Sequence, residues 1–438
     1  MSKVSQQIIN KILSFKAKGK IHVAFSGGLD SAVLLHAVVS NKTKFSEDKI
    51  VAVHVDHGLQ EVSSVWAQQC KQIALAYGID FKLIQLQVKK GKGESIELAA
   101  RNARYYEFEQ LLGPEDVMLF AHHADDQVET FLQQALRGAG VQGLGGIPES
   151  RKLGKGFLLR PLLDISRNEL NQYADSNNLQ WIEDPTNSQN DFDRNLLRND
   201  IIPLLEKRWP GAKKGLLRSL SHCREASKQI DEATDVILAD IEDENRLAVS
   251  KLAELTVIQQ KNLIRRWVRN NHIVLPNANR LESGMGALIN AAYDKNPVLD
   301  WDFGIIRRFQ DQLYINPLPE KDFRTVECWD INVKASIADG ICLEAKNGSG
   351  IGLKKDGLDL VSISIRYRQG GERCRPFGRE GAHELKKLFQ EYKIPTWLRD
   401  KVPLVYIENE IAAVIGCCYC EPFAERGDGV VKIVQVQE

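Results

Sequence analysis

The sequence has no excess of charge of either sign, because 58 Lys and Arg residues balance 58 Asp and Glu residues. The chain as a whole therefore has no field that would attract nucleic acid, and local basic patches would have to supply any such attraction. A run of about 18 apolar residues is also missing, so we expect no transmembrane helix and no membrane partner. Residues 1–20 are typical of a polar amphipathic helix and lack the apolar core of a signal peptide.

The eight cysteines show no spacing that would suggest a disulfide framework. They are scattered except for Cys417, Cys418 and Cys420, which indicates a reducing environment and a cytoplasmic location. Cys417 and Cys420 belong to an apolar, strand-like stretch, where we expect thiols to pack as small hydrophobic groups. Internal repeats and low-complexity tracts are absent from the sequence as well. The 438 residues are therefore expected to fold as two or three globular domains.

The sequence does contain a junction rich in glycine and serine between a strand pattern and a helix pattern, HVAFSGGLDSAVLLH at 22–36. Glycines permit a tight turn, and the N–H groups of a helix N-terminus bind phosphate. Ser26 and Ser31 add hydroxyl donors, and Asp30 is compatible with phosphate if Mg²⁺ lies between them. A capped helix after a glycine turn would give the same pattern. The junction is not a Walker A loop, because no Gly-Lys-Ser/Thr follows.

Strand and helix patterns alternate through the first part of the chain. The expected strands are the apolar runs at 50–55, 81–88 and 117–121, in addition to the one before the junction. This βαβ series predicts an α/β fold with a doubly wound parallel sheet. Polar residues follow three of the strands, at 26–28, 54–58 and 122–126. Because ligands bind at the carboxyl ends of parallel strands, we expect a site there.

The stretch AHHADDQVET at 121–130 would bring three titratable side chains together. On a helix that starts near Asp125, Asp126 and Glu129 share a face and lie near His122. Two carboxylates can bind an ammonium group there, and a histidine can transfer a proton near neutral pH. Two alternatives remain open. The histidines and aspartates could bind zinc, and Asp125 could simply cap the helix.

Basic residues recur on the predicted helices. Arg101 and Arg104 share a helix face, where they would either clamp a phosphate or form a solvated charged surface. Residues 194–228 contain nine Lys or Arg against three Asp or Glu, and residues 362–401 contain ten against five, with aromatic residues interleaved. Both segments can neutralise RNA phosphates, and the second can also stack on bases. Solvated helical faces are the alternative for both.

Five glycines in nine residues, GAGVQGLGG at 138–146, are too irregular for a strand and too flexible for a helix. We expect a mobile loop near the site, with a plain linker as the alternative. Beyond this stretch, three domains are expected. They are a nucleotide-binding catalytic domain at 1–214, a helical middle domain at 215–320 and a small α+β domain at 321–438.

Several of these motifs together carry a resemblance to a known family. SGGLDS resembles the pyrophosphate-binding loop of the PP-loop ATPases, which split ATP between the α and β phosphates. A longer ordered set is similar to the tRNA(Ile)-lysidine synthetase family: SGGLDS, VHVDHGL, ARNARY, AHHADDQVETFL, RPL, WIEDPTN and DRNLLR. The tail RQGGERCRP…LKKLFQEYKIPTWLRDKVPL is similar to the C-terminal domain of that family. The resemblance covers nearly the whole chain and is least distinctive at 320–360.

The resemblance implies an adenine nucleotide α-hydrolase-like fold, tRNA binding by the last domain, and an ATP-dependent ligase. It implies ATP and Mg²⁺ as cofactors, and free L-lysine and isoleucine tRNA with a CAU anticodon as substrates. ATP would adenylate O2 of the wobble cytidine 34, and the lysine ε-amine would then attack C2 and displace AMP. The product, lysidine, would change the codon specificity from AUG to AUA. A homodimer is compatible with the resemblance, which leaves the oligomeric state open.

The resemblance also implies roles for the candidate site residues. The pyrophosphate would be bound by Ser26, Gly27, Gly28, Leu29, Asp30 and Ser31. Asp30 would bind Mg²⁺, and Asp126 and Glu129 would bind the lysine ammonium group.

Three other positions complete this predicted site. His122 would contact a phosphate or move a proton. Arg194, together with Arg104 or Arg101, would balance the charge that develops on the α-phosphate. The glycine-rich stretch would cover the site and help exclude water.

Two rival functions remain open. A PP-loop tRNA 2-thiolase would activate the same carbonyl group for sulfur, and such enzymes usually carry Cys-x-x-Cys pairs close to the nucleotide fold. Here the pair with that spacing lies near the end of the chain. An ATP-responsive RNA-binding protein without turnover is the second rival, and the acidic and basic candidates at each strand end argue against it.

Overall fold

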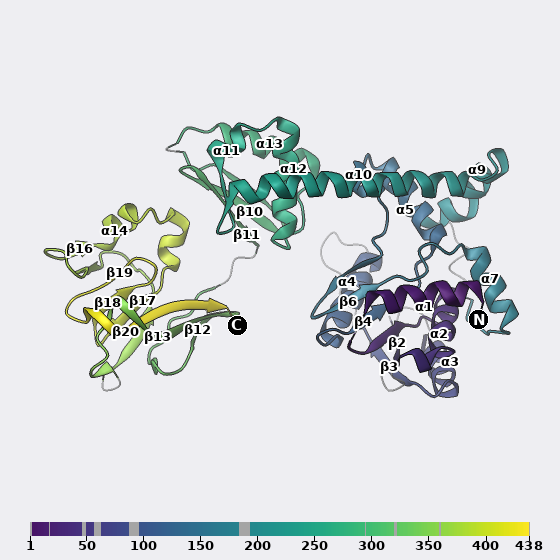
Figure 1. Cartoon of the computed structure of the whole chain (residues 1–438), viewed down its shortest axis with the longest axis horizontal. Helices are drawn as coiled ribbons and strands as arrows, with labels where there is room; N and C mark the ends of the chain where they lie inside the picture. The colour runs from purple at the N-terminus through teal and green to yellow at the C-terminus, as the bar shows by residue number, and fades with distance from the viewer. Residues whose placement is uncertain are drawn as a thin grey trace. The chain divides into compact units, whose positions relative to one another are not determined.

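The computed structural model describes residues 2–16, 18–45, 50–56, 63–86, 96–183, 193–293, 295–318, 322–358 and 361–437. These residues form two compact units, Met1–Glu232 and Ala233–Glu438 (Figure 1). Within the described ranges, no helix combines the length and the apolar character needed to cross a membrane.

The first unit alternates strands with helices, as the sequence predicts. Its strands are β1 (Ile21–Ala24), β2 (Ile50–Asp56), β3 (Asp80–Gln85), β4 (Val117–Leu119), β5 (Ser150–Leu153) and β6 (Gly156–Leu159). Its first helices are α1 (Lys3–Phe15), α2 (Leu29–Val39), α3 (Ser63–Ala76), α4 (Ile96–Leu111), α5 (Ala124–Leu136), α6 (Val141–Leu144) and α7 (Arg167–Ser176). They are followed by α8 (Asp193–Leu196), a π-helical turn (Leu197–Ile201), α9 (Ile202–Arg208) and α10 (Ala212–Ile241), which continues into the second unit.

The six strands form one sheet in the order β3-β2-β1-β4-β6-β5, and every neighbouring pair is parallel except β5 with β6. This confirms the predicted α/β fold. The strand order reverses between β1 and β4, because the chain first adds strands on one side of β1 and then on the other. In open α/β sheets, ligands bind at such a reversal, beside the carboxyl ends of the strands.

Side-chain alternation explains why the sheet is covered on both faces. Ile50 and Ala52 of β2 join a core that contains residues from α1, α2, α3 and α7. Val51 and Val53 of the same strand face the other way, into a core that contains Phe108 of α4. A strand buried on both faces reads as a continuous apolar run, as this one does.

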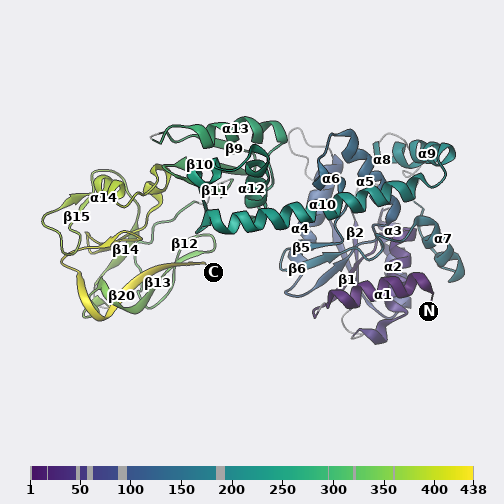
Figure 2. The same cartoon turned by 45° about the horizontal axis from the view of Figure 1, so that its top comes forward.

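The second unit begins with a region where the sequence predicts helices. The helices are present as α11 (Val249–Ala253), α12 (Val257–Asn270) and α13 (Ala278–Asn290). They accompany a five-stranded antiparallel sheet that the sequence patterns did not predict, β7-β8-β11-β10-β9 (Figure 2). Its strands are β7 (Glu242–Asp243), β8 (Arg246–Ala248), β9 (Val298–Trp301), β10 (Gly304–Phe309) and β11 (Gln312–Pro317). Trp267 is fully buried in the core that these helices and strands share.

The remainder of the second unit is α+β, as predicted. One sheet joins β12 (Ala335–Ala338), β13 (Ile341–Leu353) and β20 (Ala424–Gln437). A second joins β14 (Ile363–Arg366), β17 (Leu404–Ile407), β18 (Glu410–Val414) and β19 (Cys418–Tyr419). The hairpin of β15 (Arg373–Cys374) and β16 (His383–Glu384) precedes helix α14 (Leu385–Glu391) and a 3₁₀ turn (Thr396–Lys401). The domain boundaries at 214 and 320 stay predictions.

Candidate active site

The junction between β1 and α2 forms a compact loop with its own hydrogen bonds. Gly28 is the N-cap of α2, and among the described residues no side chain caps this helix. Its first-turn N–H groups are thus available to an anion. The Ser31 hydroxyl donates to the Gly28 carbonyl at 2.9 Å and lies 3.1 Å from the Ser26 hydroxyl. Leu29 is buried in the core beneath, which anchors the loop to the sheet.

Gly27 has a structural requirement for glycine. Its φ is +89°, and a Cβ there would lie 2.6 Å from Ile182 Cδ1 and 2.9 Å from Cys70 Sγ. The carbonyl of Gly27 also accepts a hydrogen bond from the Ile182 N–H at 2.9 Å. Ile182 therefore packs directly on the loop.

Gly27→Ala is expected to lower the free energy of unfolding by roughly 2 kcal/mol, because the new Cβ adds backbone strain to a tight contact. Gly28→Ala is the matched control, since Gly28 has φ −73° and its added Cβ would have Ser26 Oγ at 3.6 Å as its nearest neighbour. Chemical denaturation of both variants would measure the difference. Equal stability of the two variants would contradict the role given to Gly27.

A cavity of about 250 Å³ opens above the loop at the carboxyl ends of β1, β2 and β4. Its lining joins Ser26, Gly28, Asp30 and Ser31 of the loop with residues of β2, α4 and the end of β4, among them Val53, Arg104, Phe120 and His122. The mixture of apolar walls and convergent polar groups is typical of a small-ligand site.

Asp30 lies in the first turn of α2, between an arginine and a histidine side chain. Its Oδ2 accepts a hydrogen bond from Arg167 Nη1 at 3.2 Å and lies 3.6 Å from His123 Nε2. Its Oδ1 is buried and has no hydrogen-bond partner among the residues that the structure describes. A buried carboxylate oxygen without a partner is costly unless a ligand or cation satisfies it. The sequence did not suggest Arg167 or His123 as neighbours of this group.

His122 follows β4 and stacks on Phe120, with ring centroids 5.7 Å apart. Burial, together with the charges of Arg160, Arg194 and Arg104, lowers its pKa to about 3 against the opposing effect of Asp126. The imidazole is therefore neutral at neutral pH. Its Nδ1 is buried without a partner among the described residues, so it can donate to or accept from a ligand in the cavity.

The low pKa of His122 predicts a pH dependence of stability. Between pH 3 and its ordinary value of 6.5 the unfolded chain binds the proton and the folded chain does not, so stability falls as the pH falls through this window. Between pH 7 and pH 5, we expect the free energy of unfolding to fall by roughly 1–2 kcal/mol less in His122→Gln than in the parent chain. His222→Gln, at an exposed histidine, is the control. Denaturation curves that shift equally for all three proteins would contradict the prediction.

His123, rather than Asp125, caps helix α5. Its Nδ1 accepts from the Asp125 N–H at 3.2 Å, while Asp126 Oδ2 accepts from the His123 N–H at 2.8 Å. The alternative in which Asp125 simply caps the helix was therefore wrong. Burial lowers the pKa of His123, but Asp30, Asp126 and Asp125 outweigh it and raise the pKa. Protonation of Nδ1 would remove the acceptor that the helix cap needs. The carboxylates therefore favour the charged form of His123, while the cap favours the neutral form.

Asp126 and Glu129 do share one face of α5, and both are already paired. Arg194 donates to Glu129 Oε2 at 2.6 Å and to Asp126 Oδ1 at 2.7 Å. Arg198 donates to Glu129 Oε1 at 2.6 Å and reaches Asp126 Oδ1 at 3.3 Å. Two carboxylates and two guanidinium groups thus form a network with balanced formal charge. Asp126 uses its oxygens for these arginines and for the cap, which leaves the zinc alternative without a structural basis.

Arg101 and Arg104 both approach the Tyr105 ring, with guanidinium carbons 5.4 and 5.9 Å from its centroid. They do not line the same cavity. Arg104 lines the cavity above the loop, and its Nε is buried without a partner among the described residues. Burial lowers the pKa of Arg104. Arg101 instead lines a second, more open pocket with Arg151 and Arg160.

A third cavity, of about 630 Å³, is lined by Glu129 and by other residues of α5, α7, α9 and the start of α10. Its charged lining residues are Asp125, Glu129, Arg167, Arg198, Glu206, Lys213 and Lys214. Lys213 pairs with Asp125 at 2.7 Å, which holds the start of α10 against the start of α5. Both signs of charge face this cavity, which suits a zwitterionic ligand. Sequence patterns missed Arg198 and Lys213 as site residues, although both fall in the basic segment that begins at Arg194.

The glycine-rich stretch contains a short helix, α6 (Val141–Leu144), where we expected no helix. The carbonyl of Gly145 accepts from Arg224 Nη2 at 3.0 Å, and the Ile147 N–H donates to Gln127 at 2.7 Å. Four glycines at the ends of so short a helix hide it from a periodicity analysis. Parts of two predicted motifs, His57 with Gly58 and Asp184 with Pro185, lie outside the described residues.

Comparisons with known families cover most of the chain. The model described as "PP-loop domain" matches residues 1–205, "TilS substrate binding domain" matches 247–314, and "TilS substrate C-terminal domain" matches 363–433.

Individual relatives agree with these matches. A tRNA(Ile)-lysidine synthase from Coxiella burnetii is 39% identical over 434 residues, covering 99% of this chain and 96% of that protein. One from Methylococcus capsulatus is 39% identical over 399 residues, covering 90% of each. Among solved structures, a U34-tRNA thiolase from Methanococcus maripaludis matches 51% of this chain and 79% of its own, with 18% identity and a TM-score of 0.42. A likeness at that level has no bearing on function.

Proposed function

Because the chain belongs to the tRNA(Ile)-lysidine synthase family, we propose that it ligates free L-lysine to C2 of cytidine 34 in the CAU-anticodon isoleucine tRNA. The reaction consumes ATP, releases AMP and pyrophosphate, and changes the codon specificity from AUG to AUA. One observation supports this most directly. A phosphate-type loop, a neutral histidine and a network of carboxylates and arginines meet where the order of the sheet reverses.

ATP would bind in the cavity above the loop. The first-turn N–H groups of α2 and the hydroxyls of Ser26 and Ser31 face the position of its phosphates. The buried Oδ1 of Asp30 fits a magnesium ligand, because Mg²⁺ prefers one or two carboxylates together with phosphate oxygens. Bound there, Mg²⁺ would neutralise phosphate charge and orient the pyrophosphate as a leaving group.

Charge that develops at the α-phosphate has two sources of compensation. Arg104 projects into the cavity from α4, and Arg194 is oriented by Glu129 and Asp126 on α5. Donors fixed in advance stabilise such charge without reorganising during the reaction. His122, neutral in this environment, can donate a hydrogen bond to a phosphate or to the cytosine O2. A pKa of about 3 makes it too weak a base to accept the proton of the attacking amine near neutral pH.

Free lysine would bind in the cavity beside Glu129. Lysine carries one carboxylate and two ammonium groups, and this cavity offers Lys214 and Arg167 for the former and Glu129 and Glu206 for the latter. Glu129 lies at the border between this cavity and the arginine network, so it can position the ε-amine for attack. The amine must lose a proton before it attacks C2, which requires an acceptor close to these carboxylates.

The decisive experiment is mass spectrometry of nucleoside 34 after incubation of the chain with ATP, lysine and the CAU-anticodon isoleucine tRNA. We expect lysidine, formed with one pyrophosphate for each modified tRNA. Formation of a 2-thio nucleoside in the presence of a sulfur donor would favour the thiolase instead. ATP and tRNA binding without any change of the nucleoside would favour a binding protein.

We propose that the C-terminal part supplies affinity for tRNA. Lys386 and Lys387 are exposed on α14, within the basic segment 362–401. Lys386→Gln with Lys387→Gln is expected to weaken tRNA binding and to lower the slope of log affinity against log salt by about one to two units. Exposed Lys354 and Lys355, changed in the same way, are the control for net charge. Filter-binding titrations at several salt concentrations measure both, and equal slopes in the two variants would place the RNA contact elsewhere.

A further inference from the structure

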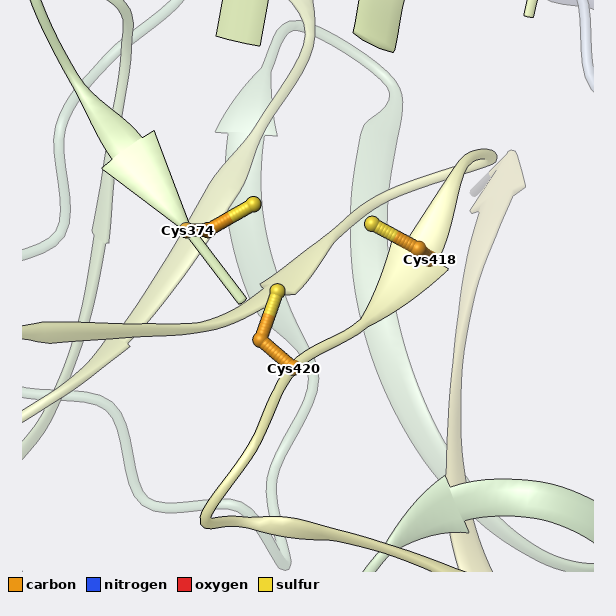
Figure 3. A group of neighbouring side chains, drawn as sticks. All are labelled: Cys374, Cys418 and Cys420. Atoms are coloured by element: carbon orange, nitrogen blue, oxygen red, sulfur yellow. The ribbon is translucent and has the colours of Figure 1, made fainter. Parts of the chain in front are cut away.

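Three cysteines that are distant in sequence meet in the second unit. Cys374 lies on β15, Cys418 on β19, and Cys420 directly after β19. Their sulfur atoms all lie within 4.8 Å of one another, and Figure 3 shows them turned toward a shared space. Among the residues that the structure describes, no other three His, Cys, Asp or Glu side chains gather in this way. The proposed ligase chemistry makes no use of this cluster.

We propose that Cys374, Cys418 and Cys420 bind a structural Zn²⁺ ion, with His383 as the fourth ligand. Thiolates bonded to one zinc at about 2.3 Å lie about 3.8 Å apart in tetrahedral geometry. The observed separations need to shorten by no more than about 1 Å to reach this value. Four-coordinate sites with three cysteines and one histidine are a common type of structural zinc site.

His383 is assigned as the fourth ligand from its place on the hairpin, and its ring must turn toward the sulfurs, because it lies outside the group whose ligand atoms are within 4.8 Å of one another. It pairs directly with Cys374 across the β15–β16 hairpin, so both side chains project from the same face of the hairpin. The imidazole is half-buried, and its Nε2 lies 3.2 Å from the Glu380 carbonyl, which leaves Nδ1 for a metal. A hydrogen bond from the second ring nitrogen to a carbonyl is the usual arrangement for a zinc-bound histidine.

Apolar packing, a disulfide or an iron–sulfur cluster would each account for less of this geometry. Packing explains the burial of Cys374 and Cys420, but Cys418 is only partly buried and its thiol still turns toward the other two. A disulfide would join two of the sulfurs and leave the third without a partner. The ligands of an iron–sulfur cluster are distributed over at least two iron atoms, so the whole set needs wider spacing than this.

The cluster lies where the β15–β16 hairpin meets the end of β19, at the edge of a buried core that includes Leu385, Phe389 and Leu404. Beyond the two-residue pairing of β15 with β16, residues 374–376 contact the end of β19 through one bridge, Pro376 with Cys420, and one hydrogen bond from Glu421 to Arg375. A shared metal ion would tie the β15–β16 hairpin to the sheet that contains β18 and β19. Removal of the ion is then expected to loosen the hairpin that leads into α14, where the exposed lysines lie.

The test uses the full chain purified from zinc-supplemented medium without chelators. We expect about one zinc per chain by plasma mass spectrometry, and a thiolate-to-cobalt charge-transfer band after the ion is exchanged for Co²⁺. Cys418→Ser should lose both signals, and Cys328→Ser, at an exposed cysteine outside the cluster, should keep both. His383→Ala should weaken zinc binding at least about tenfold in a chelator competition.

Because a cysteine variant can fail to fold, the parent chain carries the deciding measurement. If the parent chain, stripped and reloaded, binds neither zinc nor cobalt, the proposal is wrong. It is equally wrong if peptide mapping of the freshly purified chain shows a disulfide within the cluster. Unchanged zinc affinity in a folded His383→Ala variant would remove His383 from the ligand set. Activity in lysidine formation is not needed for any of these readouts, so they remain valid if the proposed function fails.

Discussion

Asp30→Asn is expected to reduce the rate of pyrophosphate release by roughly 10²–10³-fold while leaving the fold intact. The substitution keeps the size of the side chain but replaces one acceptor oxygen by an NH₂ donor and removes the charge that would bind Mg²⁺. The Oδ1 atom of Asp30 is buried at the phosphate-type loop without a partner among the described residues, so its charge is available for a cation. The rate would be followed by coupled pyrophosphate detection with ATP, tRNA and lysine present.

Two comparisons separate the metal role from the ion pair with Arg167. Arg167→Gln removes that pair but leaves the carboxylate, so we expect its Mg²⁺ dependence to stay near that of the parent chain. Asp30→Asn should instead require much more Mg²⁺ for whatever activity remains. Asp164→Asn, at an exposed aspartate, is the control for the chemistry of the substitution. A near-normal rate in Asp30→Asn, or the same Mg²⁺ dependence in Asp30→Asn and Arg167→Gln, would show that Asp30 does not bind the metal.

The parts of the fold that the sequence predicted are those with a strong local pattern. The continuous apolar run of β2 and the glycine turn before α2 each depend on residues that are neighbours in the chain. The sheet of β7 to β11 was not predicted because β7, β8 and β9 are short and because β8 pairs with β11, which comes from a distant segment. Likewise, four glycines around Val141–Leu144 obscured the helical turn of α6.

The candidate site shows the same division. The polar residues after β1 and β4 could be identified because each follows a recognisable strand. The partners that define their chemistry could not. Arg167 approaches Asp30 from 137 positions away, and Arg198 approaches Glu129 from 69 positions away. Sequence periodicity does not reveal contacts between residues so far apart. The sequence therefore assigned Asp126 and Glu129 to lysine and Arg194 to the α-phosphate, without indicating that Arg194 and Arg198 bind these carboxylates.

The second large effect is expected at the buried carboxylate of Glu129. The side chain is only 1% exposed, and its charge is compensated by Arg194 and Arg198. Arg198→Gln should lower the free energy of unfolding by roughly 3 kcal/mol, because it leaves a buried carboxylate with one partner in place of two. Glu129→Gln should cost less, since Arg194 and Arg198 are 37% and 30% exposed and can be solvated.

The double variant gives the sharper result. With Glu129→Gln in the same chain, the carboxylate that Arg198 compensated no longer exists, so most of the stability lost in Arg198→Gln should return. Urea denaturation of the two single variants and the double variant measures this coupling. Stability losses that simply add would mean that the two side chains do not interact in solution.

Activity should not return with stability. If Glu129 also positions the ammonium group of lysine, Glu129→Gln should raise the KM for lysine by roughly 10-fold or more, because a charge-assisted hydrogen bond is worth about 1.5–3 kcal/mol. The KM for ATP should change much less, since the loop after β1 is untouched. Glu225→Gln, at an exposed glutamate of α10, provides the control. An unchanged KM for lysine together with lost pyrophosphate release would instead give Glu129 a single role, which is to orient Arg194 toward the α-phosphate.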